Sequence, residues 1–320
     1  MLYTSAGSHF ELTRISIDNR QRPTYGAPVG DGEAVLAEAV AAFGAALGAR
    51  LLAAYALGSL AHGGFSPLVS DVDLGLVLAD PPRPDDPDKL GAVADTVKAA
   101  GSALHERLSV FWATPAILRG EMAGGRFPPL DRLDLLENGR LLAGRDVRPD
   151  LGPAAAPGPD ELLVAGADFA VDFLGPGHEA SGGAAGGAAL GSLAPAGDAV
   201  IAEVRNPDTL LAQGIRHTTK IVLFPVRFLY TAATGRVGTN DAAVAHHLAD
   251  PAAPAHELVA AAFSWRSEPP ADPAAATALL RGGLVPLYRH YLDDHIARLN
   301  NLKELDLASA FERWRHRLED

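Results

Sequence analysis

The first strongly patterned segment of the chain is helical. Its apolar residues recur three or four positions apart, at Val35, Leu36, Ala39, Val40, Phe43 and Leu47. This spacing lines one face of an α-helix, with Asp31 near the positive N-terminal end and Gly48 as the stop. Two short apolar runs follow, LLAAYAL (51–57) and VDLGLVL (72–78). Such runs between turn residues predict buried β-strands.

The pattern of alternating helices and strands continues to about residue 150. The next expected elements are an acidic, proline-rich loop (79–88), a helix (89–105), a strand (108–112) and a helix–turn–strand unit (131–147) that turns at Asn138-Gly139. Together they predict an α+β fold whose first part, residues 1–150, is a small mixed-sheet domain. Residues 1–30 are polar and contain prolines, and we expect an extended arm there.

The rest of the chain is patterned as helices. A linker rich in proline, alanine and glycine is expected over 151–159, and a flexible glycine-rich loop over 175–197. The expected helices are 219–231, kinked at Pro225, and 254–264, 273–284 and 285–299. We therefore expect an α-helical, substrate-binding domain over 151–320.

Composition narrows the classes of function. The chain has 320 residues, no cysteine and a formal net charge of −12. The missing cysteines exclude disulfides and thiolate metal sites, and the acidic charge disfavours a nucleic-acid partner. The N-terminus has no apolar core of signal-peptide length, and no apolar run is interpreted as long enough to span a membrane. We expect a soluble, cytoplasmic protein without a membrane partner; the oligomeric state stays open.

Two aspartates stand at the start of the second strand. Asp71 and Asp73 are two positions apart, so in a strand they point to the same side. Two neighbouring carboxylates repel each other, and a divalent cation removes that cost. Mg²⁺ commonly uses one or two carboxylates together with substrate phosphates. Both aspartates are therefore candidate metal ligands and catalytic residues.

The turn after the first strand supplies a complementary feature. Gly58 and Ser59 offer backbone N–H groups and a hydroxyl in a small turn, which is a suitable cradle for phosphate. A lone Asp-x-Asp is most often a solvated loop, and a lone Gly-Ser carries no weight. An apolar strand, Gly-Ser, a short spacer, Asp-Val-Asp and a second apolar strand form a far more specific pattern, which predicts a site for a nucleoside triphosphate and Mg²⁺.

The stretch GSLAHGGFSPLVSDVDLGLVL resembles the signature of the nucleotidyltransferase superfamily, which has the polymerase-beta-like fold. Within it, the stretch looks most like aminoglycoside adenylyltransferases that modify streptomycin and spectinomycin. RFLYTAATGRVGTNDAAVAHH (227–247) is similar to the helical-domain motif of those enzymes. The resemblance implies ATP as substrate, Mg²⁺ as cofactor and a small hydroxylated acceptor. It also implies nucleotide-binding roles for Gly58, Ser59, Ser70, Lys220, Arg227, Tyr230 and Asn240.

The chain departs from that family where a third carboxylate is expected. The family usually places this acid on a later strand, as a metal ligand or general base, and Ser109 stands in the corresponding polar position. Glu106 is the substitute we assign to catalysis. Asp131, Asp134 and Glu137 are alternatives, although these acids are also typical of a helix end or a solvated helix face.

The helical motif also departs from the family. Asn240 stands where relatives often carry a lysine, and the basic run Arg216 to Lys220 replaces the acids that hold streptomycin. Arg216 and Lys220 are candidate phosphate contacts, although a surface charge is the commoner role for such residues. Arg227 and Tyr230, three positions apart, face either the cleft or the protein core.

The leading hypothesis is therefore a Mg²⁺-dependent enzyme that transfers AMP from ATP to a hydroxyl of a small molecule and releases pyrophosphate. Two alternatives stay open. One is an ATP-binding regulator that has lost activity, because the third carboxylate is missing. The other is a toxin-like enzyme that adenylylates a protein; its relatives are usually a catalytic domain alone.

Overall fold

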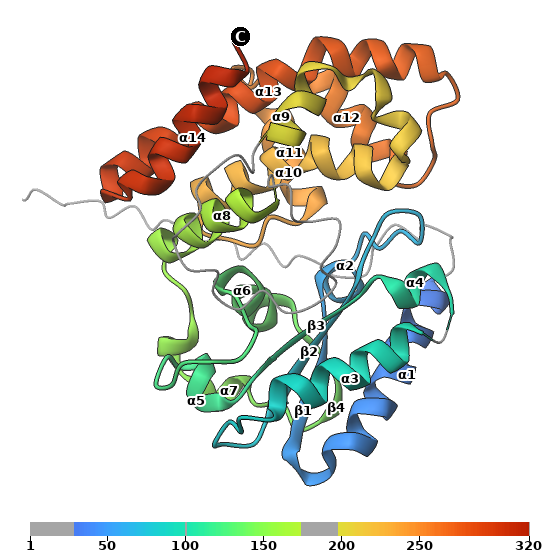
Figure 1. Cartoon of the computed structure of the whole chain (residues 1–320), viewed down its shortest axis with the longest axis vertical. Helices are drawn as coiled ribbons and strands as arrows, with labels where there is room; N and C mark the ends of the chain where they lie inside the picture. The colour runs from blue at the N-terminus through green and yellow to red at the C-terminus, as the bar shows by residue number, and fades with distance from the viewer. Residues whose placement is uncertain (1–28, 100, 174–197, 320) are drawn as a thin grey trace, which may run out of the picture.

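The computed structural model describes residues 29–99, 101–173 and 198–319. The expected arm, apart from its last two residues, and the expected loop at 175–197 lie outside these ranges. The chain forms a sheet-containing half and a helical half, which stand one above the other in Figure 1. The expected α+β class is confirmed.

A four-stranded sheet forms the centre of the first half. Its order is β3-β2-β1-β4, in which β1 pairs antiparallel with β2 and β4, and β2 pairs parallel with β3. The strands are β1 (Leu51–Leu57), β2 (Val72–Leu78), β3 (Leu108–Ala113) and β4 (Arg140–Gly144). The mixed sheet expected from the apolar runs is thus confirmed.

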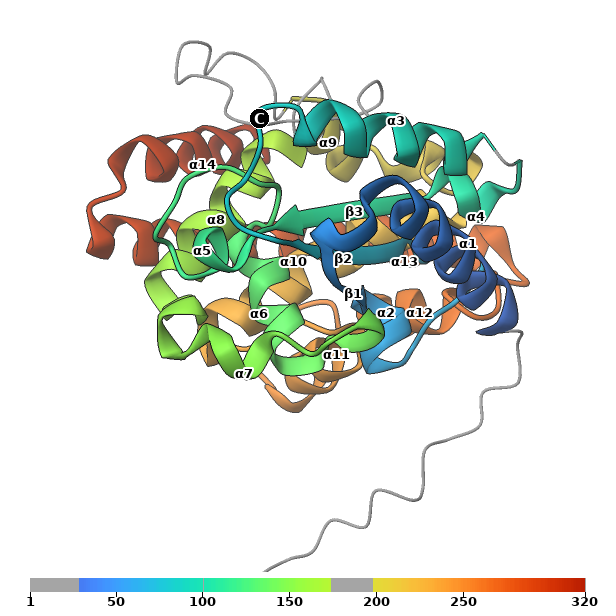
Figure 2. The same ribbon diagram turned by 90° about the horizontal axis from the view of Figure 1, so that it is seen from below.

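Helices cover both faces of this sheet (Figure 2). One face packs against α1 (Val29–Leu47), α3 (Asp86–Lys98) and α4 (Ala103–Glu106). The other face packs against α5 (Pro115–Leu118), α6 (Pro129–Asn138) and α7 (Arg148–Leu151). Because both faces are covered, β1 and β2 are nearly continuous apolar runs instead of alternating ones.

The single helix expected over 89–105 is wrong. Gly101 has a φ of 108°, which ends α3, and Ser102 begins α4 as its N-cap by accepting the backbone N–H of His105. The apolar spacing continues across the break because both pieces pack on the same sheet face. The apolar periodicity therefore predicted the buried face that the two helices share, but it gave no sign of the break between them.

Helix α1 bears on the membrane question. The stretch Gly30–Arg50 is long and apolar enough, by length and composition alone, to cross a membrane, so the expectation that no run reaches this length is wrong by that measure. Leu36, Ala39 and Phe43 are at most 1% exposed and pack against the sheet strands. A core helix of a soluble protein passes the same test; one face of α1 packs on the sheet, and 33% of the apolar stretch is buried.

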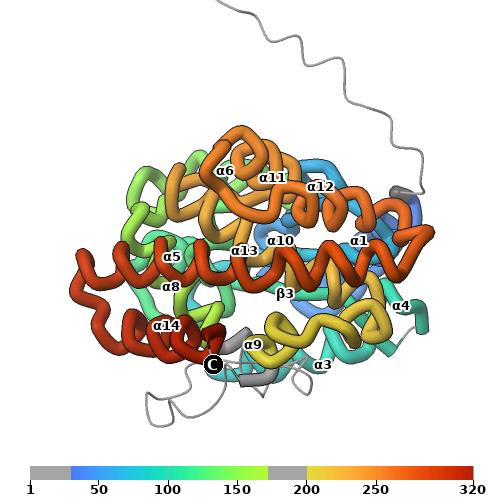
Figure 3. The backbone as a smooth tube through the Cα atoms, turned by 90° about the horizontal axis from the view of Figure 1, so that it is seen from above, coloured from blue at the N-terminus to red at the C-terminus, as the bar shows by residue number. Residues whose placement is uncertain are grey.

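The second half is a bundle of helices around one apolar core. Figure 3 shows the long α13 crossing this half, with α10 and α12 beside it. The main helices are α8 (Pro159–Phe173), α9 (Asp198–Arg205), α10 (Ile215–Thr234), α11 (Asn240–Ala249), α12 (His256–Trp265), α13 (Pro273–Leu302) and α14 (Leu305–Arg317). Short 3₁₀ turns lie at Gly48–Arg50, Pro153–Ala155, Pro207–Thr209 and Leu211–Gln213.

Three expectations for this half need correction. The helices expected over 273–284 and 285–299 are one helix that contains Pro286, because Leu284, Leu287 and Tyr288 are fully buried on both sides of the proline and hold it in the core. The expected linker is partly core, since Ala155 is fully buried. Helix α8 was not expected, although Pro159 and the acids of its first turn are helix-start signals.

The two halves meet through polar contacts. Arg266, which follows α12, donates to the carbonyl of Gly64 at 2.7 Å, and its own carbonyl accepts the Ser66 hydroxyl. A second contact between the halves is the ion pair of Arg132 on α6 with Glu161 on α8, at 2.5 Å. A third contact, the ion pair between Arg216 near the start of α10 and Asp71 just before β2, brings these two ends together.

Candidate active site

The Gly-Ser turn and the second aspartate are in direct contact. Leu57, the last residue of β1, is the register partner of Asp73 in β2. Gly58 follows with a φ of 58°, and a Cβ at this position would lie 2.2 Å from Oδ2 of Asp73. Only glycine fits both the left-handed backbone and the close approach of the carboxylate. The turn and the aspartate pair, predicted to form one site, therefore lie together.

The environment of Asp73 is strongly acidic. Burial raises the pKa of Asp73 to about 8, and the charges of Asp71, Asp131 and Asp134 add to this rise. Asp73 still keeps some accessible surface. The carboxylate is therefore held in surroundings that disfavour its charge, where a cation would relieve the repulsion.

Two of the four acids come from α6. Asp134 is 7% exposed and accepts the backbone N–H of Gly58 at 2.6 Å and the side-chain amide of Asn138 at 2.9 Å. Asp131 lies one turn earlier, and burial, followed by the charge of Asp134, raises its pKa to about 7. The sequence offered both only as alternatives, and the i, i+3 spacing at the start of a helix was the signal that could have joined them.

Three cations of α10 face these acids. Arg216 forms an ion pair with Asp71 at 2.5 Å. Burial lowers the pKa of Lys220, while Asp71 is the strongest charge that opposes this effect. Burial likewise lowers the pKa of Arg227, whose Nε donates to the carbonyl of Gly238 at 2.6 Å. Arg227 keeps accessible surface although protein surrounds it, as expected for a side chain that lines a concavity.

Other residues expected at the site have mixed placements. The hydroxyl of Ser70 accepts the backbone N–H of Ser66 at 3.0 Å, so it holds the loop before β2. Tyr230 packs edge to face on His246, with ring centroids 5.5 Å apart. Asn240 is the first residue of α11 and follows the N-cap Thr239.

The structure also shows where the residues considered for the third carboxylate lie. Ser109 is the register partner of Asp73 in β3, the polar position where the resemblance to the family led us to expect an acid. Glu106 is exposed at the end of α4, where its charge acts on Arg107. Glu137 is exposed at the end of α6, where it accepts the backbone N–H of Val237 at 3.4 Å. Neither glutamate is among the strongest charges that act on Asp73.

A second group of charged side chains lies beside the loop that follows the Gly-Ser turn. A Cβ at Gly64 would lie 2.8 Å from Oδ2 of Asp241, the second residue of α11. Asp241 also opposes, by its charge, the burial that lowers the pKa of Arg266 and of His62. His62 ends α2 (Gly58–His62). The Asp241 that follows Asn240 in the second motif thus reaches the loop of the first.

The carboxylate oxygens of the aspartate cluster (Asp71, Asp73, Asp131 and Asp134) suit Mg²⁺. Among the described residues no group of three or more metal-ligating side chains forms a ready cage. Mg²⁺ does not require one, because it is commonly held by one or two carboxylates plus phosphate oxygens and water. Asp71 and Asp73 supply two such carboxylates, and burial together with the neighbouring carboxylates raises the pKa of Asp73, so its charged form gains from a cation. These residues therefore fit the ion.

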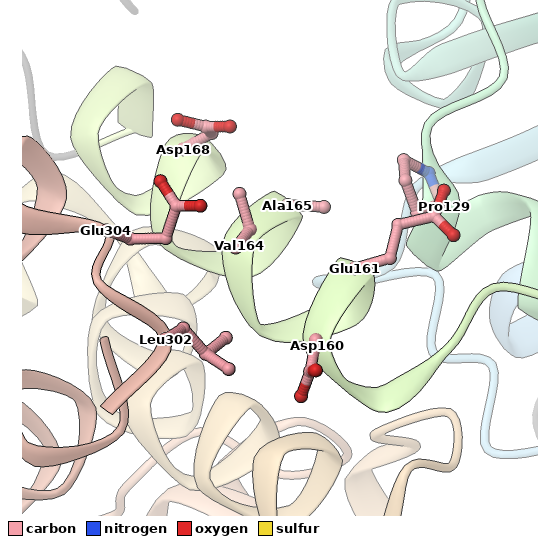
Figure 4. A pocket seen from close by; sticks show the side chains of 8 residues that line it. All are labelled: Pro129, Asp160, Glu161, Val164, Ala165, Asp168, Leu302 and Glu304. Atoms are coloured by element: carbon pink, nitrogen blue, oxygen red, sulfur yellow. The ribbon is translucent and has the colours of Figure 1, made fainter. Parts of the chain in front are cut away.

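An open groove of about 520 Å³ lies on α8, lined also by the turn between α13 and α14. Figure 4 shows its carboxylates spread along the groove. Its lining residues are Pro129, Asp160, Glu161, Val164, Ala165, Asp168, Leu302 and Glu304. None of them belongs to the aspartate cluster, and of α6 only Pro129 reaches the groove.

No protein-family model and no curated protein sequence matches the chain. Among solved structures, the chain is similar to that of spectinomycin adenyltransferase AAD(9) from Enterococcus faecialis, determined with ATP and spectinomycin. The TM-score is 0.46 and the sequence identity 12%, and the match covers 91% of this chain and 99% of the other.

Proposed function

We propose that the protein is a Mg²⁺-dependent nucleotidyltransferase that moves AMP from ATP to a hydroxyl of a small molecule and releases pyrophosphate. The observation that carries the proposal is the contact between Gly58 and Asp73. It brings a glycine turn at the end of β1 against the paired aspartates at the start of β2. A phosphate-binding turn and metal-binding carboxylates need this proximity, and a structural role alone would not place so many acids together.

In this proposal each half supplies one kind of charge. Asp71 and Asp73 would hold Mg²⁺, which when bound neutralises charge on the phosphates of ATP. Arg216, Lys220 and Arg227 line the opposite side and would bind the triphosphate oxygens. Arg216 must leave Asp71 to do so, and their partly exposed ion pair contributes at most about 1 kcal/mol, so the exchange is cheap.

The chain's own residues would then act mainly by positioning. Gly58, whose N–H is fixed by Asp134, sets the turn against which the phosphates lie. The cations of α10 hold the α-phosphate and the leaving pyrophosphate in line with the attacking hydroxyl. The acceptor would sit between the two halves, where ligand sites commonly occur. A cell compartment that contains ATP, the cytoplasm, is the matching location.

A second candidate is an ATP-binding regulator without transfer activity. Two observations favour it. Ser109 stands beside Asp73 where the family usually has an acid, and Asp134 already takes the Gly58 N–H that a phosphate would use. The two candidates differ in turnover and not in binding.

The test combines binding with turnover. Calorimetry measures binding of ATP with Mg²⁺, and a coupled assay measures pyrophosphate release with streptomycin, spectinomycin, simple sugars and nucleosides as acceptors. The enzyme hypothesis expects binding and acceptor-dependent release in the wild type, and loss of release in Asp73→Asn. Asp95→Asn, a change on α3 remote from the site, is the matched control and keeps both. Binding without release from any acceptor favours the regulator, and wild-type release by Asp73→Asn contradicts the metal assignment.

A further inference from the structure

The sheet supplies only two of the acids that such a reaction commonly uses. Ser109 pairs in parallel register with Asp73, so the two side chains point to the same face about 5 Å apart. A serine hydroxyl is a weak base without a partner, and no charge on β3 replaces it. A base for the acceptor hydroxyl must therefore come from another element.

Helix α6 brings two carboxylates to the same place. It packs against β1 and α2, and Asp131 and Asp134 lie one turn apart on one side of it. Both act on Asp73, since they are the strongest charges on it after Asp71. Helix α6 therefore brings two further carboxylates to Asp73, one of which contacts the Gly-Ser turn directly.

The two acids of α6 have different surroundings. Both oxygens of Asp134 accept hydrogen bonds, from Gly58 and from Asn138, and its side chain is buried. Asp131 is partly exposed, and in the described part of the chain its own backbone N–H is the donor that its carboxylate meets. Asp134 thus positions the turn, whereas Asp131 has oxygens available to a substrate.

The charged groups that face Asp131 come from several elements. Asp134 lies on the same helix and Asp73 on β2, while Arg126 and Arg227 approach from the loop before α6 and from α10. Arg126 is itself fixed, since it donates to the carbonyl of Val110 at 2.9 Å. Asp131 therefore lies among two acids and two cations, which come from α6, β2, α10 and the loop before α6.

Resting on the nucleotidyl transfer proposed above, we propose that Asp131 is the general base of the reaction and replaces the acid missing from β3. The acceptor oxygen forms a bond to the α-phosphorus of ATP. The bond from that phosphorus to the oxygen bridging to the β-phosphate breaks, and its electron pair leaves with pyrophosphate. The proton of the hydroxyl passes to a carboxylate oxygen of Asp131 and from there to solvent.

The test uses the full chain and four variants, of which His62→Gln serves the last comparison below. Asp131→Asn removes the base and keeps the size of the side chain. Glu137→Gln, on the same helix but turned toward Val237, is the matched control for loss of one acid. The double variant Asp131→Asn with Ser109→Asp returns a carboxylate beside Asp73. Pyrophosphate release is measured with the acceptor that the wild type uses fastest, and ATP with Mg²⁺ is titrated by calorimetry.

The proposal expects Asp131→Asn to lower kcat by about 10²- to 10⁴-fold while the Kd for ATP with Mg²⁺ changes less than about threefold. Glu137→Gln should leave kcat and the Kd for ATP unchanged. The double variant should have a kcat at least about tenfold higher than that of Asp131→Asn alone. A structural role for Asp131 would show no such recovery. Two results overturn the assignment: turnover by Asp131→Asn at the wild-type rate, or a loss of ATP binding as large as its loss of turnover.

Failure of the proposed function is distinguishable from failure of this assignment. A wild type that binds ATP but releases no pyrophosphate overturns both. A wild type that turns over, together with loss of turnover in His62→Gln and not in Asp131→Asn, overturns the assignment alone and moves the role to the histidine beside the Gly-Ser turn.

Discussion

Replacing Asp73 by asparagine should stabilise the protein while it abolishes transfer. The pKa of Asp73 is raised from 3.8 to about 8 by burial and by three neighbouring carboxylates. A raised carboxyl pKa means that the folded state binds the proton more tightly than the unfolded state. Stability from this group is therefore highest below about pH 4 and falls as the pH rises toward 8. Asparagine carries no charge and removes this loss.

The size of the effect follows from the shift. Between pH 3.8 and pH 7 the loss is about 1.4 kcal/mol per pH unit, so the upper limit at pH 7 is about 4 kcal/mol. Asp73 keeps some contact with water, and Asp131 can take up part of the proton in its place. We therefore expect Asp73→Asn to raise the free energy of unfolding by about 1–3 kcal/mol at pH 7. At pH 4 the difference from the wild type should be close to zero.

Urea unfolding of both proteins, followed by circular dichroism from pH 4 to 8 without Mg²⁺, measures this difference. The curves should separate as the pH rises. Asp95→Asn, which removes an exposed acid of α3, is the matched control and should follow the wild type. An Asp73→Asn protein that is less stable than the wild type at pH 7, or equally stable throughout, would refute the electrostatic strain described here.

Three further predictions concern single changes in the unfolding free energy or in ligand binding. Gly58→Ala should lower the free energy of unfolding by about 2–3 kcal/mol, because of the left-handed φ and the clash with Asp73. Gly48→Ala has a similar φ of 54° but open space around the new methyl group, so it should lower the free energy of unfolding by only about 1 kcal/mol. Urea unfolding of both variants measures the difference. Arg50→Met should cost about 3 kcal/mol because Asp86, 1% exposed, loses its charged partner, which urea unfolding at pH 7 measures. Arg216→Ala should change stability by less than about 1 kcal/mol, since its ion pair is partly exposed, yet weaken ATP binding about tenfold by calorimetry; unchanged binding contradicts its phosphate role.

Local pattern sufficed for the elements whose signals are strong and contiguous. The strand at 51–57 and the helix–turn–strand unit near Asn138 lie where the sequence placed them, because apolar runs and turn residues act over a few positions. The break at Gly101 and the continuity across Pro286 were missed. At Gly101 a local signal, glycine followed by an N-cap serine, broke the helix although the apolar spacing continued. At Pro286 packing in the core outweighed the preference of the proline to end a helix.

The sequence by itself determined the Gly-Ser turn and the aspartate pair, because strand alternation fixes which residues share a side and only glycine tolerates the backbone at Gly58. The tertiary structure alone decided that Asp131 and Asp134 join them and that Arg216 faces Asp71, 145 residues away. No local rule links a helix to a strand so far along the chain. Their meeting is set by how the helices close over the sheet, where burial and charge act through space and not along the sequence.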